Sequence, residues 1–297
     1  ERSLRTVNLL KLQPSPNHFA IISHIISIAK MVQLRSGKEL KENVLKGWDR
    51  WLIVNPESTI KKPLQPNEYL LQCGKIIEPY WYNERLRNEA ATIQYIREHT
   101  TIPVPEARLY EENGGLCLEL SRLPGIKMMD VMAHAGPKKR ELIIKSVNEQ
   151  LEWWILPEIR KFKRNFIGSV DESIPTFPPF RIFQKDRRDW PRIQHPEADF
   201  VLCHNGLSEY SIYIAKDSWT IVGIDDWECA GFFPRYFEQP FWKDASESVP
   251  DNRYEEAVVK ELAFFGLKQS DLQDDGAKPE PPRRIVTQKK KQQSRRK

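Results

Sequence analysis

Two adjacent carboxylates that could bind a metal ion, Asp225 and Asp226, come directly after the apolar run Ile221–Ile224. Carboxylate oxygens are preferred ligands of Mg2+, and residues at the end of a buried strand are held at a fixed place. The pair could instead form a solvated turn, but its position before Trp227 favours a role facing a metal. We therefore expect Asp226, with Asp225 beside it, to face any cation that binds.

A single histidine, His204, follows another apolar run, Phe200–Cys203. Imidazole titrates near neutral pH, so this side chain could act as a general base. A lone histidine is more often a hydrogen-bonded structural residue, and we favour a role in bracing the segment that follows it. The two candidate positions for chemistry are thus each preceded by a short buried strand.

The elements that position these residues are strands and helices of the second half of the chain. Two short β-prone segments, 211–215 and 220–224, flank the four residues Lys216-Asp217-Ser218-Trp219, which is typical of a hairpin. Apolar residues recur at helical spacing within 136–166, as far as Pro157, and a further helix is expected from about 252 to 265.

The first half predicts strands around one helix. A compact apolar run at 69–73, closed by Gly74, predicts a buried strand, and helical spacing within 83–99 predicts a helix. Segments 107–110 and 116–120 flank an Asn-Gly-Gly turn, a strong signal for a hairpin.

The change from strands to helices near residue 125 predicts two lobes in an α+β fold. We expect a poorly readable segment at 1–66, with an apolar helix around 19–34 and the start of a small lobe. The small lobe then occupies 67–123 and a mainly helical large lobe 124–270, followed by a disordered basic tail at 271–297.

The segments 200–212 and 221–232 resemble the aminoglycoside phosphotransferase family, especially its fungal branch. That family carries His-Gly-Asp-Leu-Ser-Pro-x-Asn-Ile-Leu, then a hairpin, then Ile-Ile-Asp-Trp-Glu-x-Ala-Gly. Further matches follow the family's order across roughly 68–242: Asn88-Glu89-Ala90, Thr101-Ile102-Pro103-Val104-Pro105, Leu118-Glu119-Leu120, Pro124-Gly125, Ile167-Gly168-Ser169-Val170-Asp171 and Pro240-Phe241-Trp242. The resemblance implies a two-lobed protein-kinase-like fold that uses ATP and Mg2+ to phosphorylate a small hydroxylated substrate.

Laid on the family motif, this chain has lost side chains that the reaction needs in the large lobe. Gly206 stands where the catalytic Asp belongs, and Ser211 stands where a metal-binding Asn belongs. Glycine cannot deprotonate a hydroxyl group, and serine offers one weak neutral oxygen. Asp226 matches the second metal ligand, while Asp225 replaces an apolar residue.

In the small lobe, the resemblance places Gln72 where the family has the cation that grips phosphate. A neutral amide cannot pair with Glu89, the family's carboxylate partner, so that glutamate could be a plain exposed helix residue. Lys75 could substitute for the cation, although strand alternation turns it away from Gln72. Glu119 and Leu120 match the strand that contacts the nucleotide before the lobes join.

Three functions follow from these observations. The first is a degenerate phosphotransferase with weak or no phosphoryl transfer, which binds nucleotide or a partner. The second is a working ATP-dependent enzyme that uses Asp225, Asp226 and Lys75 in a rearranged site. The third is an interaction protein that binds polyanions through its basic tail.

The net charge of +5 comes from this tail. Residues 278–297 hold nine Lys or Arg residues and one Glu, so the rest of the chain carries a charge of about −3. Its clusters at 289–291 and 295–297 resemble nuclear-localisation patches. The four cysteines form no close pair, and no run is long enough to span a membrane. We expect a cytoplasmic protein, with a nuclear location as the alternative.

Overall fold

The computed structural model describes residues 43–72, 75–183, 188–197, 199–244 and 252–272. The apolar helix expected around 19–34 and almost all of the expected tail lie outside these residues. None of the helices in the described part of the chain is both long enough and apolar enough to cross a membrane.

An antiparallel five-stranded sheet, with the order β1-β2-β3-β7-β6, forms the body of the small lobe. Its strands are β1 (Asn43–Lys46), β2 (Arg50–Val54), β3 (Ser58–Pro63), β6 (Ala107–Glu112) and β7 (Gly115–Ser121). The predicted hairpin at β6 and β7 is confirmed, and both of its turn residues, Asn113 and Gly114, have the positive φ that tight hairpin turns require.

The strand expected at 69–73 is not part of this sheet. Residues 70–72 and 75–77 instead form β4 (Leu70–Gln72) and β5 (Lys75–Ile77), which pair with each other as a separate two-stranded sheet. The strands that precede the helix in the main sheet come from residues 43–63, inside the segment that the sequence left poorly readable. Interruption by Pro56 and the pair Lys61-Lys62 hid their alternation.

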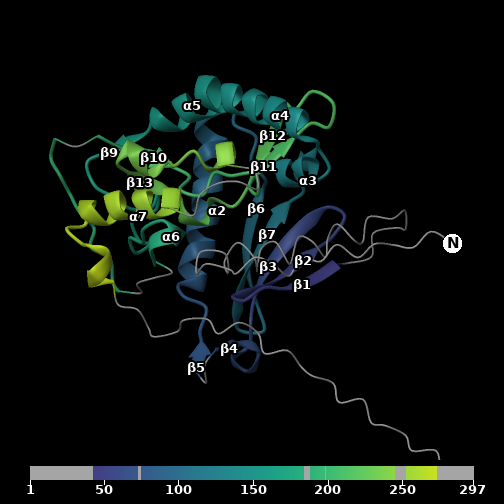
Figure 1. Cartoon of the computed structure of the whole chain (residues 1–297). Coiled ribbons are helices and arrows are strands. Elements are labelled where there is room, and N and C mark those ends of the chain that lie inside the picture. The colour runs from purple at the N-terminus through teal and green to yellow at the C-terminus, as the bar shows by residue number, and fades with distance from the viewer. Residues whose placement is uncertain (1–42, 73–74, 184–187, 198, 245–251, 273–297) are drawn as a thin grey trace, which may run out of the picture.

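The helix predicted within 83–99 is confirmed as α2 (Tyr82–His99), which buries Leu86, Ile93 and Ile96 completely. Figure 1 shows α2 running between the sheet and the helical part of the molecule. It packs against β6 and β7 on one side and against the 3-10 helix η3 (Trp227–Cys229) on the other. Polar residues along α2 can therefore reach both lobes.

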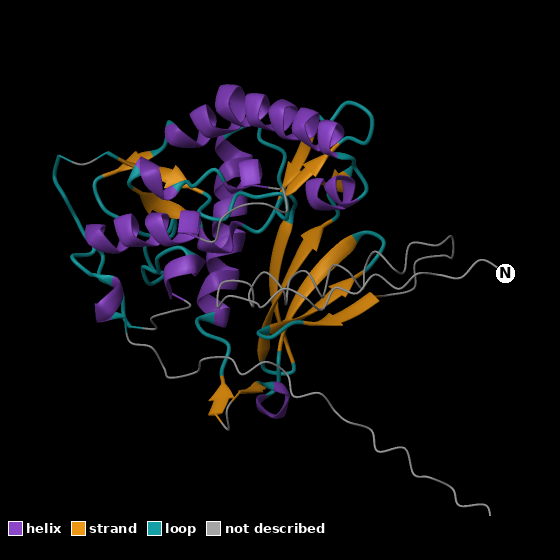
Figure 2. Cartoon of the chain, in the orientation of Figure 1, coloured by secondary structure: helices purple, strands orange, loops and turns teal. Residues whose placement is uncertain are grey.

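Helices make up most of the large lobe (Figure 2). They are α3 (Met128–Ala133), α4 (Pro137–Gln150), α5 (Leu156–Arg160), α6 (Phe180–Phe183) and α7 (Asn252–Phe264). The helical stretch does not stop at Pro157, because a π-helical turn, η2 (Leu151–Ile155), joins α4 to α5. This wider turn brings the chain past a proline that lacks an N–H group.

Two small sheets carry the segments with chemical potential. In one, β10 (Phe200–Cys203) pairs with β9 (Lys163–Arg164) and β13 (Gly231–Phe233). In the other, β11 (Ile212–Ile214) pairs with β12 (Ile221–Ile224) and β8 (Ile126–Lys127), which confirms the second predicted hairpin. A strand-rich small lobe joined to a mainly helical large lobe is the two-lobed α+β fold that the sequence predicted.

Candidate functional site

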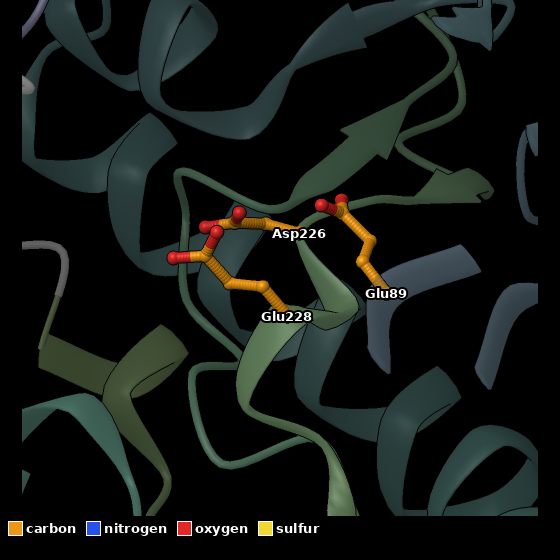
Figure 3. A group of neighbouring side chains, drawn as sticks. All are labelled: Glu89, Asp226 and Glu228. Atoms are coloured by element: carbon orange, nitrogen blue, oxygen red, sulfur yellow. The ribbon is translucent and has the colours of Figure 1, made fainter. Parts of the chain in front are cut away.

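A buried lysine on the small-lobe sheet joins the two lobes at the candidate site. The Lys61 ammonium on β3 lies 2.7 Å from Glu89 Oε2 on α2 and 3.1 Å from Asp226 Oδ1 of the large lobe. The side chains of Lys61 and Glu89 are 9% and 0% exposed, whereas that of Asp226 is 40% exposed. Figure 3 shows Glu89 and Asp226 converging with Glu228 on one region. Asp226 is thus the solvent-facing member of a charged cluster.

This geometry corrects the expectation that the cation paired with Glu89 had been lost. Glu89 is not an exposed helix residue, and its partner is Lys61 rather than a residue at position 72. Gln72 lies on β4, and Lys75 lies opposite it on β5, both in the separate hairpin. The available signal was the lysine pair itself, since adjacent side chains of a strand point to opposite faces and one of the two lysines then points inward.

The electrostatics of the cluster keep Lys61 charged. Burial disfavours its ammonium form, but the carboxylates of Glu89, Asp226 and Glu228 outweigh burial and raise the pKa of Lys61 far above its ordinary value. Burial and the neighbouring carboxylates raise the pKa of Glu89 against the opposing effect of Lys61. The site therefore keeps a permanent positive charge beside an accessible carboxylate.

Glu228 lies in the same acidic group but is bound by cations. One oxygen of each of Glu89, Asp226 and Glu228 lies within 4.8 Å of the others. Both oxygens of Glu228 are engaged by guanidinium groups, Oε2 by Arg50 at 2.7 Å and Oε1 by Arg85 at 2.9 Å. No role was predicted from the sequence for Glu228, Arg50 or Arg85.

The loop after β10 is fixed by its histidine. The backbone N–H of Gly206 donates to His204 Nδ1 at 3.2 Å, and His204 Nε2 lies 2.9 Å from the carbonyl oxygen of Asp225. A donor facing Nδ1 and an acceptor facing Nε2 require the neutral tautomer protonated at Nε2. His204 is 1% exposed, and its contacts are those of a brace between the two segments.

Gly206 itself is exposed and has room for a side chain. A Cβ atom there would meet only the His204 ring, at 3.7 Å from Nδ1 and 3.8 Å from Cε1, which is ordinary contact. The preceding residue, Asn205, takes the left-handed conformation of this turn, with a φ of 66°. The loop thus has the shape to present a side chain at position 206, although glycine presents none.

Ser211 and Asp225, two of the three residues predicted to bind metal, are engaged elsewhere. Ser211 is fully buried, and its hydroxyl accepts from the N–H of Ser208 at 3.1 Å and donates to the Ser208 carbonyl at 3.2 Å. Asp225 pairs with Lys127 at 3.1 Å, a partner that the sequence did not indicate. Asp226 alone of the three presents a well-exposed carboxylate.

The two other residues predicted to contact nucleotide lie on β7. Leu120 is buried, at 5% exposed. Glu119 accepts a hydrogen bond from Arg108 Nε at 3.0 Å, and this bond holds the pKa of the Glu119 carboxyl below its ordinary value. Both lie next to Lys61 in the sheet, because Lys61 on β3 pairs with Leu118, the residue before them on β7.

The donor set of the cluster fits a magnesium ion held by few protein ligands. Mg2+ prefers carboxylate oxygens and keeps several waters, with ligand phosphates completing its shell. Asp226 would hold the ion, while Glu89 and Glu228 are neutralised by Lys61 and by the two arginines. When bound, such an ion would neutralise charge on a phosphate group next to Lys61.

No family model matches the chain, and no curated protein matches it either. Solved structures similar to it include the ADP-bound aminoglycoside phosphotransferase APH(2'')-Ib, with a TM-score of 0.42 and 10% identity over 80% of this chain and 86% of that one. The thermostable APH(4)-Ia mutant in its apo form gives 0.42 and 13% over 79% and 84%. The streptomycin–ATP complex of APH(2'')-IIa gives 0.42 and 10% over 87% and 90%.

Proposed function

We propose that this chain is a kinase-fold, phosphotransferase-like protein that binds nucleotide with Mg2+ but transfers phosphoryl groups poorly. The observation that carries the proposal is the contact of Lys61 with both Glu89 and Asp226 at the junction of the lobes. A fixed ammonium beside an accessible carboxylate can bind a phosphate oxygen and its metal ion together. The proposed site therefore needs neither a cation at position 72 nor a substitute from Lys75.

The impairment proposed here comes from two losses, the base on the acceptor side at position 206 and the metal ligand at position 211. Transfer to a hydroxyl group needs a carboxylate that accepts the hydroxyl proton, and position 206 offers no side chain. His204 does not replace it, because both of its ring nitrogens are engaged with the backbone. The small hydroxylated substrate implied by the family resemblance therefore lacks its base in this chain.

The test is the thermal stabilisation of the protein by ATP with Mg2+. A ligand that binds the native state raises its stability by about 2.7 kcal/mol when present at 100 times its dissociation constant. Lys61→Met should abolish this shift, because it removes the ammonium from the cluster.

The matched control is Lys62→Met on the same strand, whose ammonium pairs with Glu112 at 2.6 Å outside the cluster. It should leave the ATP-dependent shift unchanged. A parent protein with no shift at millimolar ATP, or equal shifts for both variants, would contradict the proposed function.

A further inference from the structure

The turn between β1 and β2 ends in a buried charged residue, Asp49, although hairpin turns normally face water. Asp49 and Arg50 are 6% and 7% exposed, and Arg85, the α2 residue that meets them, is 1% exposed. The guanidinium of Arg85 bonds to Asp49 Oδ2 at 2.8 Å, and that of Arg50 bonds to the same oxygen at 2.6 Å. Burying three charges is costly unless each is paired, and here each one is.

These arginines reach across the lobe junction to Glu228. Arg50 and Arg85 each bind one of its carboxylate oxygens, so neither oxygen lacks a cation. The side-chain amide of Asn88 on α2 also donates to the carbonyl oxygens of Glu228 at 3.0 Å and Ala230 at 2.8 Å. The short helix η3 is therefore held to the small lobe through both its side chain and its backbone.

The residue directly before η3, at its N-cap, is Asp226. It takes a left-handed conformation, with φ of 65° and ψ of 46°, which is costly for a residue other than glycine and persists only when its surroundings fix it. After it, the Trp227 indole donates to the Ile224 carbonyl at 3.0 Å, and Glu228 is clamped by the arginines. The direction of the Asp226 side chain thus depends on contacts made two residues later.

We propose that Arg50 and Arg85 are positioning residues, which hold Asp226 in its metal-facing orientation by clamping Glu228, and that Glu228 is not a metal ligand. This inference rests on the proposed function, because it assumes that Asp226 binds the cation. Outer contacts that orient a ligating carboxylate typically change metal affinity by about 10- to 100-fold when they are removed.

The alternative, that Glu228 ligates the metal, predicts the opposite sign. Replacing Arg85 removes a positive charge from the cluster and frees one oxygen of Glu228, which by itself strengthens cation binding. If the arginine acts by positioning, the same replacement weakens binding despite the favourable change in charge. The sign of the effect therefore separates the two roles.

The experiment measures the dissociation constant of Mn2+ alone, by calorimetry or by the spin-resonance signal of free Mn2+, on the full chain. The control variant is Arg97→Met. It is compared with the parent protein and with four variants of the clamp, Arg85→Met, Arg85→Lys, Arg50→Met and Glu228→Gln. Arg97 lies on the same helix, but its pair with Glu106 is solvent-exposed. We expect Arg85→Met, Arg50→Met and Glu228→Gln to weaken Mn2+ binding about tenfold. Arg85→Lys should recover part of the loss, and Arg97→Met should have no effect.

Unchanged or tighter Mn2+ binding by Arg85→Met and Arg50→Met would overturn the inference while leaving the proposed function standing. Absence of Mn2+ binding by the parent would instead overturn the proposed function. The double variant Arg85→Met with Glu228→Gln tests the clamp through protein stability, in case the single variants bind Mn2+ poorly only because they unfold. If the two side chains act as one clamp, its free energy of unfolding falls by less than the sum of the single effects. Additive losses would contradict the clamp itself.

Discussion

Position 206 lacks the side chain that would accept a proton from a substrate hydroxyl group. The loop around it is complete, with a neutral histidine behind it and a left-handed Asn205 before it, yet Gly206 offers no group that can accept a proton. Its backbone is not in the left-handed region, and a Cβ atom would meet only the His204 ring at ordinary distance. Glycine is therefore not required here by geometry, unlike Gly125, whose φ is +83° and whose Cβ would lie 2.6 Å from the Ile214 carbonyl oxygen.

A residue-scale prediction follows for Gly206→Asp. We expect this change to alter the free energy of unfolding by less than about 0.5 kcal/mol, as surface substitutions usually do. It should also raise the slow turnover of ATP, because a carboxylate returns to the loop. Unfolding by urea and a phosphate-release assay measure the two effects.

Gly125→Ala is the matched control for stability and should cost more than about 1 kcal/mol, since both its φ and its contacts oppose a side chain. A Gly206→Asp variant that folds normally and binds ATP, yet turns over no faster than the parent, would show that position 206 does not face the acceptor.

At the scale of elements, two helices far apart in sequence support this loop. Arg181 on α6 donates to the Asn205 carbonyl at 2.7 Å, and Arg181 Nε donates to the fully buried Glu261 on α7 at 2.8 Å. On its other side, Glu238 accepts the backbone N–H groups of His204 and Asn205. Burial raises the pKa of Glu238 above its ordinary value, although the two N–H groups favour the carboxylate.

The prediction at this scale concerns Arg181→Met. Removing one partner of a buried ion pair leaves the other charge uncompensated, which costs about 3–5 kcal/mol. The free energy of unfolding should fall by that amount, and the amides of residues 204–206 should exchange faster with solvent. Urea denaturation and hydrogen exchange measure these changes.

Lys163→Met serves as the comparison, because its pair with Asp199 at 2.6 Å is solvent-exposed. Exposed pairs contribute about 0–1 kcal/mol. Equal losses for the two variants would mean that the Arg181 pair does not stabilise the loop.

At the scale of the whole molecule, charged groups rather than apolar contacts mark the junction between the lobes at the site. Lys61, Arg50 and Arg85 from the small lobe meet Asp226 and Glu228 from the large lobe. Burial opposes ionisation of Asp49, but Arg50 and Arg85 outweigh it and hold the pKa of Asp49 well below its ordinary value of 3.8. The stability of the ion-pair network on the small-lobe side of this junction should therefore depend on pH.

A carboxyl group whose pKa is lower in the folded state binds protons more readily when unfolded. Its contribution to stability is complete above the ordinary pKa and is lost as the pH falls below it. The parent should therefore lose stability between pH 5 and pH 3 more steeply than Asp49→Asn, which has no such group to titrate. Urea denaturation at pH 5, 4 and 3 compares the two slopes. Parallel slopes would show that Asp49 does not carry this linkage.

Local pattern decided much of this molecule from the sequence alone. Helix α2, the hairpins β6–β7 and β11–β12, and helix α7 were predictable because their periodicity and turn residues are local properties. The positions of His204, Gly206 and Asp226 followed from their neighbours in the chain. The sequence placed the start of the small lobe within 1–66 but did not delimit strands β1 to β3, because mixed polar residues and Pro56 interrupt their alternation and only pairing with β7 completes them.

Tertiary structure alone decided which charges meet. The sequence had indicated that Glu89 lost its cationic partner to Gln72. In the structure its partner is Lys61, because β3 and not β4 lies in the sheet beside α2. Glu228, 143 residues from Arg85 in the chain, meets it only where α2 packs against η3. An ion pair between distant segments leaves no periodic trace in a sequence, since its energy depends on distance and burial in the folded chain. The residues capable of chemistry were legible one by one, but the network that orients Asp226 came from the fold.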